Sequence, residues 1–152
     1  MNPIEQFREE VSNNIEGLGR DFDLQALSRI WIREISPHKW SYNFSWLGRP
    51  AIQFPNDVWA MQELIWQIRP DLIIETGIAH GGSLIFSASM LALLDMCDAI
   101  ESGVPMNPGE SKRKVLGVDI DIRAHNRTAI EAHPMASRIE MIQGSSIAPD
   151  VV

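Results

Sequence analysis

Cysteine is almost absent from this chain, and the residue patterns of metal and hydrolytic sites are missing as well. Cys97 is the single cysteine, so no internal disulfide can form. Because it stands in an apolar run, we predict a small core residue rather than a nucleophile. The four histidines include no i, i+4 pair, and no Cys-x-x-Cys occurs. The sequence therefore supports neither a zinc site nor a hydrolytic triad.

Basic charge and long apolar runs are also scarce. The formal net charge is -7, whereas nucleic-acid binding needs clustered Lys and Arg, so we predict no nucleic-acid partner. No basic segment followed by an apolar one opens the chain, and no signal peptide is predicted. The longest apolar stretch, residues 84–97, contains Asp95 and is predicted to be too short to cross a bilayer. A cytoplasmic location is the resulting expectation.

The most informative stretch is residues 72–86, Leu-Ile-Ile-Glu-Thr-Gly-Ile-Ala-His-Gly-Gly-Ser-Leu-Ile-Phe. Its first apolar residues predict a buried parallel strand, and a helical pattern begins just past the glycines. A Gly-rich turn between a strand and a helix is where α/β proteins bind nucleotides, because backbone N–H groups there point at the ligand. We therefore expect a ligand at this turn.

The spacing of this turn differs from the dinucleotide fingerprint G-x-G-x-x-G. The chain has Glu75-x-Gly77-x-x-x-Gly81-Gly82-Ser83 instead. An acid at the strand tip would repel a pyrophosphate but accepts a hydrogen bond from an ammonium group. A ligand with an amine and a carboxylate fits better, and S-adenosylmethionine carries both. We predict that Glu75 faces the amine and that Ser83, with the helix N-terminus, holds the carboxylate. The alternative is a plain tight turn with a solvated acid.

The second predicted strand, residues 115–121, ends in two acids. In nucleotide-binding α/β folds an acid at this place accepts hydrogen bonds from both ribose hydroxyls, and Asp119 is the candidate. Asp121 is the competitor, since it could instead cap the following helix. A third short strand, residues 139–142, leads to a small polar turn in which Ser146 is the candidate adenine contact. Ser146 could equally be the N-cap of a helix starting at Ile147.

Before the Gly-rich turn, the sequence predicts two helices and an aromatic loop. Apolar residues at helical spacing predict amphipathic helices over residues 4–15 and 24–35. Residues 38–55 are irregular and rich in aromatics, and they could form a lid or one wall of the site. The equal alternative is a satellite hydrophobic cluster beneath a long loop. We accordingly divide the chain into N-terminal helices and loop, residues 1–55, and a partial cofactor-binding domain, residues 56–152.

Several of these segments together resemble one known family, the cephalosporin hydroxylase and rhamnosyl O-methyltransferase family. The resemblance is carried by Tyr42-Asn43, Gln53-Phe54-Pro55-Asn56-Asp57, Pro70-Asp71-Leu72-Ile73-Ile74-Glu75-Thr76-Gly77, Gly81-Gly82-Ser83, Gly117-Val118-Asp119-Ile120-Asp121 and Gly144-Ser145-Ser146. It implies a Rossmann-like, S-adenosylmethionine-dependent methyltransferase fold that acts on a hydroxyl of a sugar, glycolipid or secondary metabolite. The spacing is also similar to that of catechol-type O-methyltransferases, in which the positions of Ser83 and Asp119 take the methionine carboxylate and the ribose.

The resemblance also implies parts that this chain lacks. Family members continue with further strands whose acids bind magnesium beside the acceptor hydroxyl, and this sequence stops before them. We therefore expect the N-terminal half of the fold only, about three parallel strands preceded by helices, with an open sheet edge that a homo-oligomer could cover. Two other functions stay open: a non-catalytic interaction or assembly element, and an NAD-binding oxidoreductase module.

Overall fold

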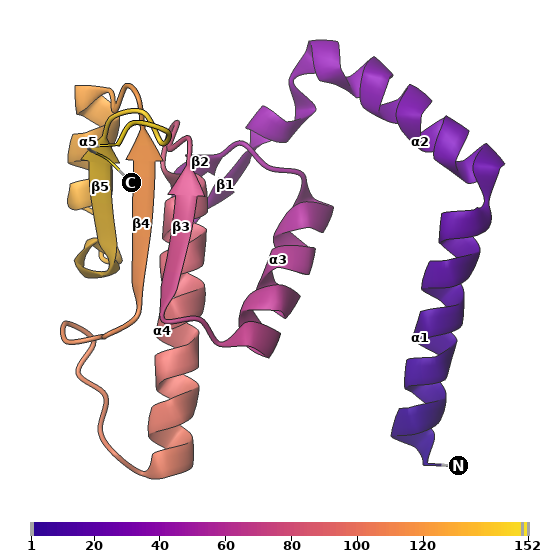
Figure 1. The fold of residues 1–152 in the computed structure, drawn as a ribbon, viewed down its shortest axis with the longest axis horizontal. Coiled ribbons are helices and arrows are strands. Elements are labelled where there is room, and N and C mark those ends of the chain that lie inside the picture. The colour runs from indigo at the N-terminus through magenta and orange to yellow at the C-terminus, as the bar shows by residue number, and fades with distance from the viewer. Residues whose placement is uncertain (1, 150, 152) are drawn as a thin grey trace. The chain divides into compact units, whose positions relative to one another are not determined.

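The computed structural model describes residues 2–149 and 151, which form two compact units, one up to Trp40 and one from Ser41 on (Figure 1). The first unit is helical, with α1 (Pro3–Arg20), α2 (Phe22–Ile35) and the short helix η1 (Ser36–His38). The side chains of Asn2 and Asp21 cap α1 and α2 by accepting from the backbone N–H groups of Ile4 and Leu24. Both predicted helices are confirmed.

The second unit is built around a three-stranded parallel sheet. Its elements in chain order are η2 (Trp40–Asn43), β1 (Phe44–Trp46), β2 (Arg49–Ala51), α3 (Pro55–Ile68), β3 (Leu72–Thr76), α4 (Gly82–Ser102), β4 (Lys114–Asp119), α5 (Ala124–Glu131), η3 (Ala136–Arg138) and β5 (Ile139–Gln143). The strand order is β3-β4-β5, and both pairings are parallel. The prediction of an α/β fold with three parallel strands is confirmed.

Helix α4 provides the core of this unit. Leu84, Leu91 and Leu94 are completely or almost completely buried, and they pack with Val115 of β4 and Ile130 of α5. Figure 1 shows α4 running behind the sheet. With 21 residues, α4 is longer than the apolar stretch that the sequence suggested, and it is the one helix among the described residues that is apolar enough to cross a membrane by length and composition. Here it serves as the central helix of a packed core.

An ion-pair network joins the long loop after α4 to the C-terminal half of that helix. The Arg113 guanidinium lies 2.5 Å from Asp95 and 2.7 Å from Asp98, and Arg138 lies 2.6 Å from Asp95. Burial opposes the charge of Asp95, but hydrogen bonds from Ser111, Arg138 and Arg113 outweigh it and lower the pKa of this carboxyl. The network fixes where β4 begins.

The aromatic segment, predicted as an irregular loop, contains a β-hairpin instead. Strands β1 and β2 pair antiparallel, with Leu47 and Gly48 in the turn, both at positive φ. Two positive φ values in a two-residue loop match the twist of hairpin strands. The Trp46 indole donates to Ser89 Oγ at 2.9 Å and meets the Phe86 ring edge-on at 4.9 Å, so the hairpin is seated on α4.

The hairpin comes so close to α4 that the helix must begin with glycine. A Cβ on Gly82 would lie 2.3 Å from the Pro50 carbonyl oxygen, which is backbone and cannot swing away. Gly82→Ala should therefore lower the free energy of unfolding by about 2 kcal/mol, as overpacking does. Gly109→Ala is the matched control, because its Cβ would meet nothing closer than Asn107 Oδ1 at 3.7 Å. Urea unfolding of both variants checks this, and equal stabilities would contradict it.

Candidate functional site

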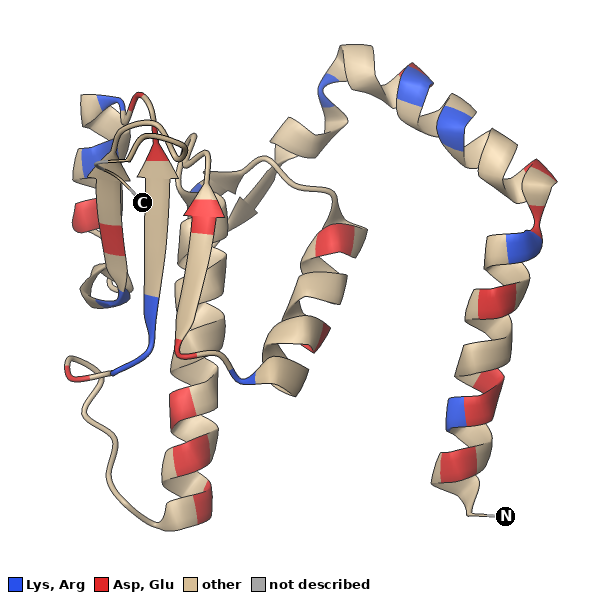
Figure 2. Cartoon of the chain, in the orientation of Figure 1, with Lys and Arg blue, Asp and Glu red and all other residues tan. Residues whose placement is uncertain are grey.

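The carboxyl ends of the three strands meet at one edge of the sheet, where two acids stand at neighbouring strand tips. Glu75 is near the end of β3 and Asp119 ends β4, as Figure 2 shows by their red tips. The pairing of Thr76 with Val118 keeps these tips level. Parallel sheets of this kind bind ligands at this edge, so the site is built from the segments that follow β3, β4 and β5.

The segment from Gly77 to Gly81 makes the turn between β3 and α4. Gly77 has φ +88° and donates from its N–H to the Val118 carbonyl at 2.8 Å. Nothing lies within 4 Å of where a Gly77 Cβ would be, so the position needs glycine for its backbone angle and leaves open space beside it. Gly81 also has positive φ and would clash with Ile130 if it carried a side chain.

Asp119 holds this turn from the neighbouring strand. Its Oδ2 accepts from the N–H groups of Ile78 at 2.6 Å and Ala79 at 3.4 Å, and its Oδ1 accepts from the N–H of Asp121 at 3.0 Å. Burial opposes ionisation, but the backbone hydrogen bonds from Asp121, Ile78 and Ala79 lower the pKa of Asp119. These hydrogen bonds thus favour the charged form of the carboxylate.

Asp121 and Ser146 are both exposed. Asp121 is exposed and does not cap α5, whose N-cap is Arg123 and has no side-chain cap. Ser146 is exposed in the turn after β5, and the described residues that follow it form turns rather than a helix beginning at Ile147. The capping alternatives for both residues are therefore wrong.

Glu75 and Ser83 form the polar pair of the site. The Ser83 hydroxyl donates a short hydrogen bond to Glu75 Oε1. Burial raises the pKa of Glu75, and the Ser83 hydrogen bond offsets this only in part. Within the described part of the chain no basic side chain pairs with Glu75. A half-buried carboxylate without a cationic partner is unusual, because a buried charge is normally paired.

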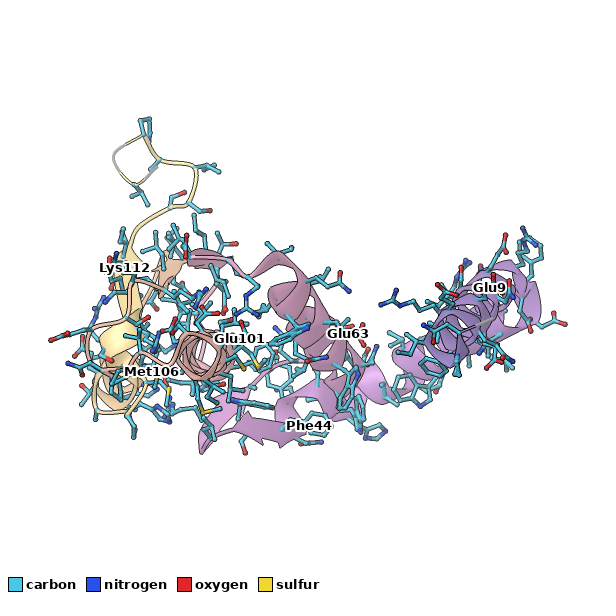
Figure 3. All side chains as sticks on the ribbon, turned by 90° about the horizontal axis from the view of Figure 1, so that it is seen from below. Glu9, Phe44, Glu63, Glu101, Met106 and Lys112 are labelled. Atoms are coloured by element: carbon cyan, nitrogen blue, oxygen red, sulfur yellow. The ribbon has the colours of Figure 1, made fainter. Side chains whose placement is uncertain are left out.

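A cavity of 720 Å³ opens beside this pair. Its walls come from the hairpin, α3, β3 and the first turns of α4; in Figure 3, Phe44 marks the hairpin and Glu63 marks α3. Most of the lining is apolar, including Trp46, Met61, Phe86 and Met90. The aromatic segment thus forms one wall of this cavity, and its role at a ligand site stays a prediction.

The structure brings together most of the predicted site residues. Five of them line the cavity: Glu75, Gly77, Gly81, Gly82 and Ser83. Asp119 and Ser146 lie outside that lining, although Asp119 contacts its turn directly. In the described residues no cluster of three or more His, Cys, Asp or Glu side chains could hold a metal ion.

Sequence reasoning missed two polar residues that hold the turn. Arg49 of β2 donates from Nε at 3.1 Å and Nη2 at 2.6 Å to the His80 carbonyl. Asn126 of α5 donates to the Ala79 carbonyl at 2.8 Å. The Asn126 Oδ1 lies 3.3 Å from both Arg49 Nη2 and His80 Nδ1. The burial of Asn126 indicates this role, because a buried amide is normally hydrogen-bonded, and the sequence alone does not show that burial.

Comparison with known proteins assigns the family. Residues 38–152 match the family Rhamnosyl O-methyltransferase/CmcI. This chain belongs to the rhamnosyl O-methyltransferase/CmcI family. The match includes the hairpin, the Gly-rich turn and all three strands of the sheet, and it confirms the resemblance seen in the sequence. It gives no support to the NAD-binding or the non-enzymatic alternative.

The match between this chain and individual family members extends over only part of each protein. The rhamnosyl O-methyltransferase of Mycobacterium leprae (strain TN) is 37% identical over 60 residues, which are 36% of this chain and 26% of that protein. The rhamnosyl O-methyltransferase of Mycobacterium bovis (strain BCG / Pasteur 1173P2) is 33% identical over 60 residues, which are 36% of this chain and 24% of that protein. The chain thus spans about a quarter of the length of these curated relatives.

Two solved CmcI structures match this chain at lower identity. The structure with SAH gives a TM-score of 0.44 at 21% identity and covers 67% of this chain and 43% of that chain. The apo structure gives a TM-score of 0.46 at 21% identity, and the match covers 72% of this chain and 39% of that chain.

The raised pKa of Glu75 predicts a pH-dependent stability difference. Below the unfolded-state pKa the carboxyl is neutral in both states and has no effect on unfolding. As pH rises towards the folded pKa, the buried charge increasingly destabilises the fold. Glu75→Gln should therefore raise the free energy of unfolding at pH 7, with a gain that shrinks towards pH 4. Urea unfolding at several pH values checks this, with Glu63→Gln on the exposed side of α3 as control. A gain that does not change with pH would contradict it.

Proposed function

We propose that this chain binds S-adenosylmethionine and is the cofactor-binding portion of an O-methyltransferase for a hydroxyl of a sugar, glycolipid or secondary metabolite. One observation supports this most strongly. Glu75 is a half-buried carboxylate without a basic partner, at the wall of an apolar cavity and beside the N-terminus of α4. An ammonium group satisfies the acid, and a carboxylate suits the helix N-terminus.

The residues of the site fit the two ends of the amino-acid part of the cofactor. The ammonium group would pair with Glu75, which Ser83 orients through its hydroxyl. The carboxylate would accept from the first N–H groups of α4, because these have no acceptor within the helix. Since the single Ser83 hydroxyl proton points at Glu75, Ser83 can donate to the ligand only by exchanging that bond.

Two further contacts belong to the nucleoside. Asp119 would accept from the ribose hydroxyls with the lone pairs that its backbone partners leave free. Ser146, exposed beyond β5, would contact the adenine ring. Both assignments rest on the position of these residues at the carboxyl ends of β4 and β5.

The bound cofactor supplies the methyl group, and the protein supplies alignment and exclusion of water. Holding acceptor oxygen, methyl carbon and sulfur in line accounts for most of the acceleration of such a transfer. The apolar walls of the hairpin and α3 would exclude water from one side of the cavity. Because aromatic surface stacks on sugars and on planar metabolites alike, the acceptor class includes both. Magnesium is expected for the family, but the residues that the structure describes include no cluster that could hold it. A cytoplasmic location remains part of the proposal.

Calorimetric titration with S-adenosylmethionine, S-adenosylhomocysteine and NAD tests the cofactor assignment. We expect the two S-adenosyl ligands to bind and NAD not to bind. Glu75→Gln should weaken binding by about 10- to 100-fold, because a hydrogen bond to a charged group is worth roughly 1.5–3 kcal/mol. Asp119→Asn, which keeps an acceptor for the turn, should weaken it less. Glu63→Gln should bind as the wild type does. No binding by a folded wild-type chain would contradict the assignment.

We propose in addition that a second copy of the chain covers the free edge of the sheet. β3 is the outermost strand of the described sheet, and its Ile74 side chain is 61% exposed on the face away from α4. Leu72 and Ile142 add exposed apolar surface to that face. An unpaired apolar edge strand readily pairs with another chain.

Sedimentation velocity checks this oligomer. We expect a dimer at micromolar concentrations, and Ile74→Lys should shift it to monomer because a charge on the covered face would be buried. Leu93→Lys is the control, since Leu93 is exposed on α4 and away from that edge. A wild-type monomer at all concentrations would contradict the proposal.

A further inference from the structure

Three consecutive residues of the Gly-rich turn are each held at a backbone group by a side chain from a different element. The Ile78 N–H donates to Asp119 at the end of β4. The Ala79 carbonyl accepts from Asn126 Nδ2 of α5, and the His80 carbonyl accepts from Arg49 of β2. These contacts come from the sheet, from a helix and from the hairpin, so the path of the turn is fixed from three sides.

The turn needs this support because one of its residues is in an unfavourable conformation. Ala79 has φ +46°, in the left-handed region that glycine occupies easily and alanine does not. Its N–H lies 3.4 Å from Asp119 Oδ2 and its carbonyl 2.8 Å from Asn126 Nδ2, so both sides of this residue are held. Such strained residues persist only where their surroundings hold them, and they cluster at ligand sites.

Asn126 is the centre of the arrangement. It is 3% exposed, and both ends of its amide are used. Nδ2 donates to the turn, while Oδ1 accepts from Arg49 Nη2 at 3.3 Å and lies 3.3 Å from His80 Nδ1. Because Oδ1 can only accept, a bond to His80 requires the tautomer with the proton on Nδ1. One buried amide therefore ties α5, the hairpin and the turn together.

We infer that Asn126, with Arg49, is a positioning residue for the cofactor. The turn is followed directly by the first residues of α4, whose N–H groups would bind the ligand. At its other end, open space lies beside Gly77. Without Asn126, Ala79 relaxes towards negative φ and moves these donors away from the ligand. This inference rests on the proposed function, because it concerns the same S-adenosyl site. Asn126 does not touch the ligand; it acts through the turn.

The test combines removal of the support with removal of the strain. Asn126→Ala should weaken S-adenosylhomocysteine binding about tenfold by calorimetry. Adding Ala79→Gly should restore affinity to within about threefold of the wild type, because glycine holds the same positive φ without support. Ala79→Gly alone gives the reference affinity against which the rescue is measured. His125→Ala, an exposed neighbour on α5, is the matched control and should have no effect. A merely structural role for Asn126 would not be rescued by a change at Ala79.

A second variant and a second measurement keep the test decisive. Asn126→Asp can still pair with Arg49 but has no donor for the Ala79 carbonyl, so it should fold and bind as weakly as Asn126→Ala. In the ligand-free chain, amide hydrogen exchange at Ile78 and Ala79 should quicken in both variants and slow again with Ala79→Gly.

The outcomes separate the two proposals. Wild-type affinity in Asn126→Ala, or no rescue by Ala79→Gly, would overturn the positioning role while cofactor binding stands. No binding by a folded wild type would overturn the cofactor site and the positioning role together, and the exchange rates would then report only on the turn itself.

Discussion

The burial of the first turns of α4 is the constraint on which the rest of this unit depends. Leu84 and Ile85 are fully buried, and the hairpin backbone lies so close to Gly82 that a side chain there would not fit. Gly117 of β4 allows the same close approach from the sheet, because a Cβ there would lie about 3 Å from the side chains of Ile78 and Leu84. The start of α4 is therefore held in close contact with both the hairpin and the sheet.

With both ends of the turn fixed, the backbone between them has few paths. It adopts positive φ at Gly77, Ala79 and Gly81, of which only the second carries a Cβ. The polar side chains around the turn then divide into two groups. Asp119, Asn126 and Arg49 use their hydrogen bonds on the backbone of the turn, whereas Glu75 has only the Ser83 hydroxyl. Backbone hydrogen bonds thus already compensate the charge of Asp119, whereas no basic side chain among the described residues compensates that of Glu75.

Much of the fold could be predicted because its signals are local. The strand at residues 72–76 is a short apolar run with β-branched residues, and glycines mark where α4 begins. The hairpin was missed because its strands are three residues long and one contains Pro50, a residue that argues against a strand. Its signal was the pair Leu47-Gly48, which is weaker than Asn-Gly.

The site was predictable in its residues but not in all their partners. The sequence placed an acid at the tips of the first two parallel strands, and the structure has Glu75 and Asp119 there. It could not show that Ser83 points at Glu75, because that depends on how the first turn of α4 rotates. Nor could it show that Asn126 reaches Ala79 and Arg49, which are 47 and 77 residues away along the chain. Contacts across such separations follow from packing, and local patterns do not contain them.

The uncompensated carboxylate links ligand binding to stability. In the free chain, ionised Glu75 opposes folding, because burial raises its pKa. A ligand with an ammonium group at this place would remove that opposition and add the attraction of an ion pair in a partly apolar wall. Binding and stability are then linked through a single group, most strongly at pH values above its folded pKa. A neutral or anionic ligand of the same shape would leave Glu75 uncompensated, so charge selects the ligand where the largely apolar cavity by itself does not.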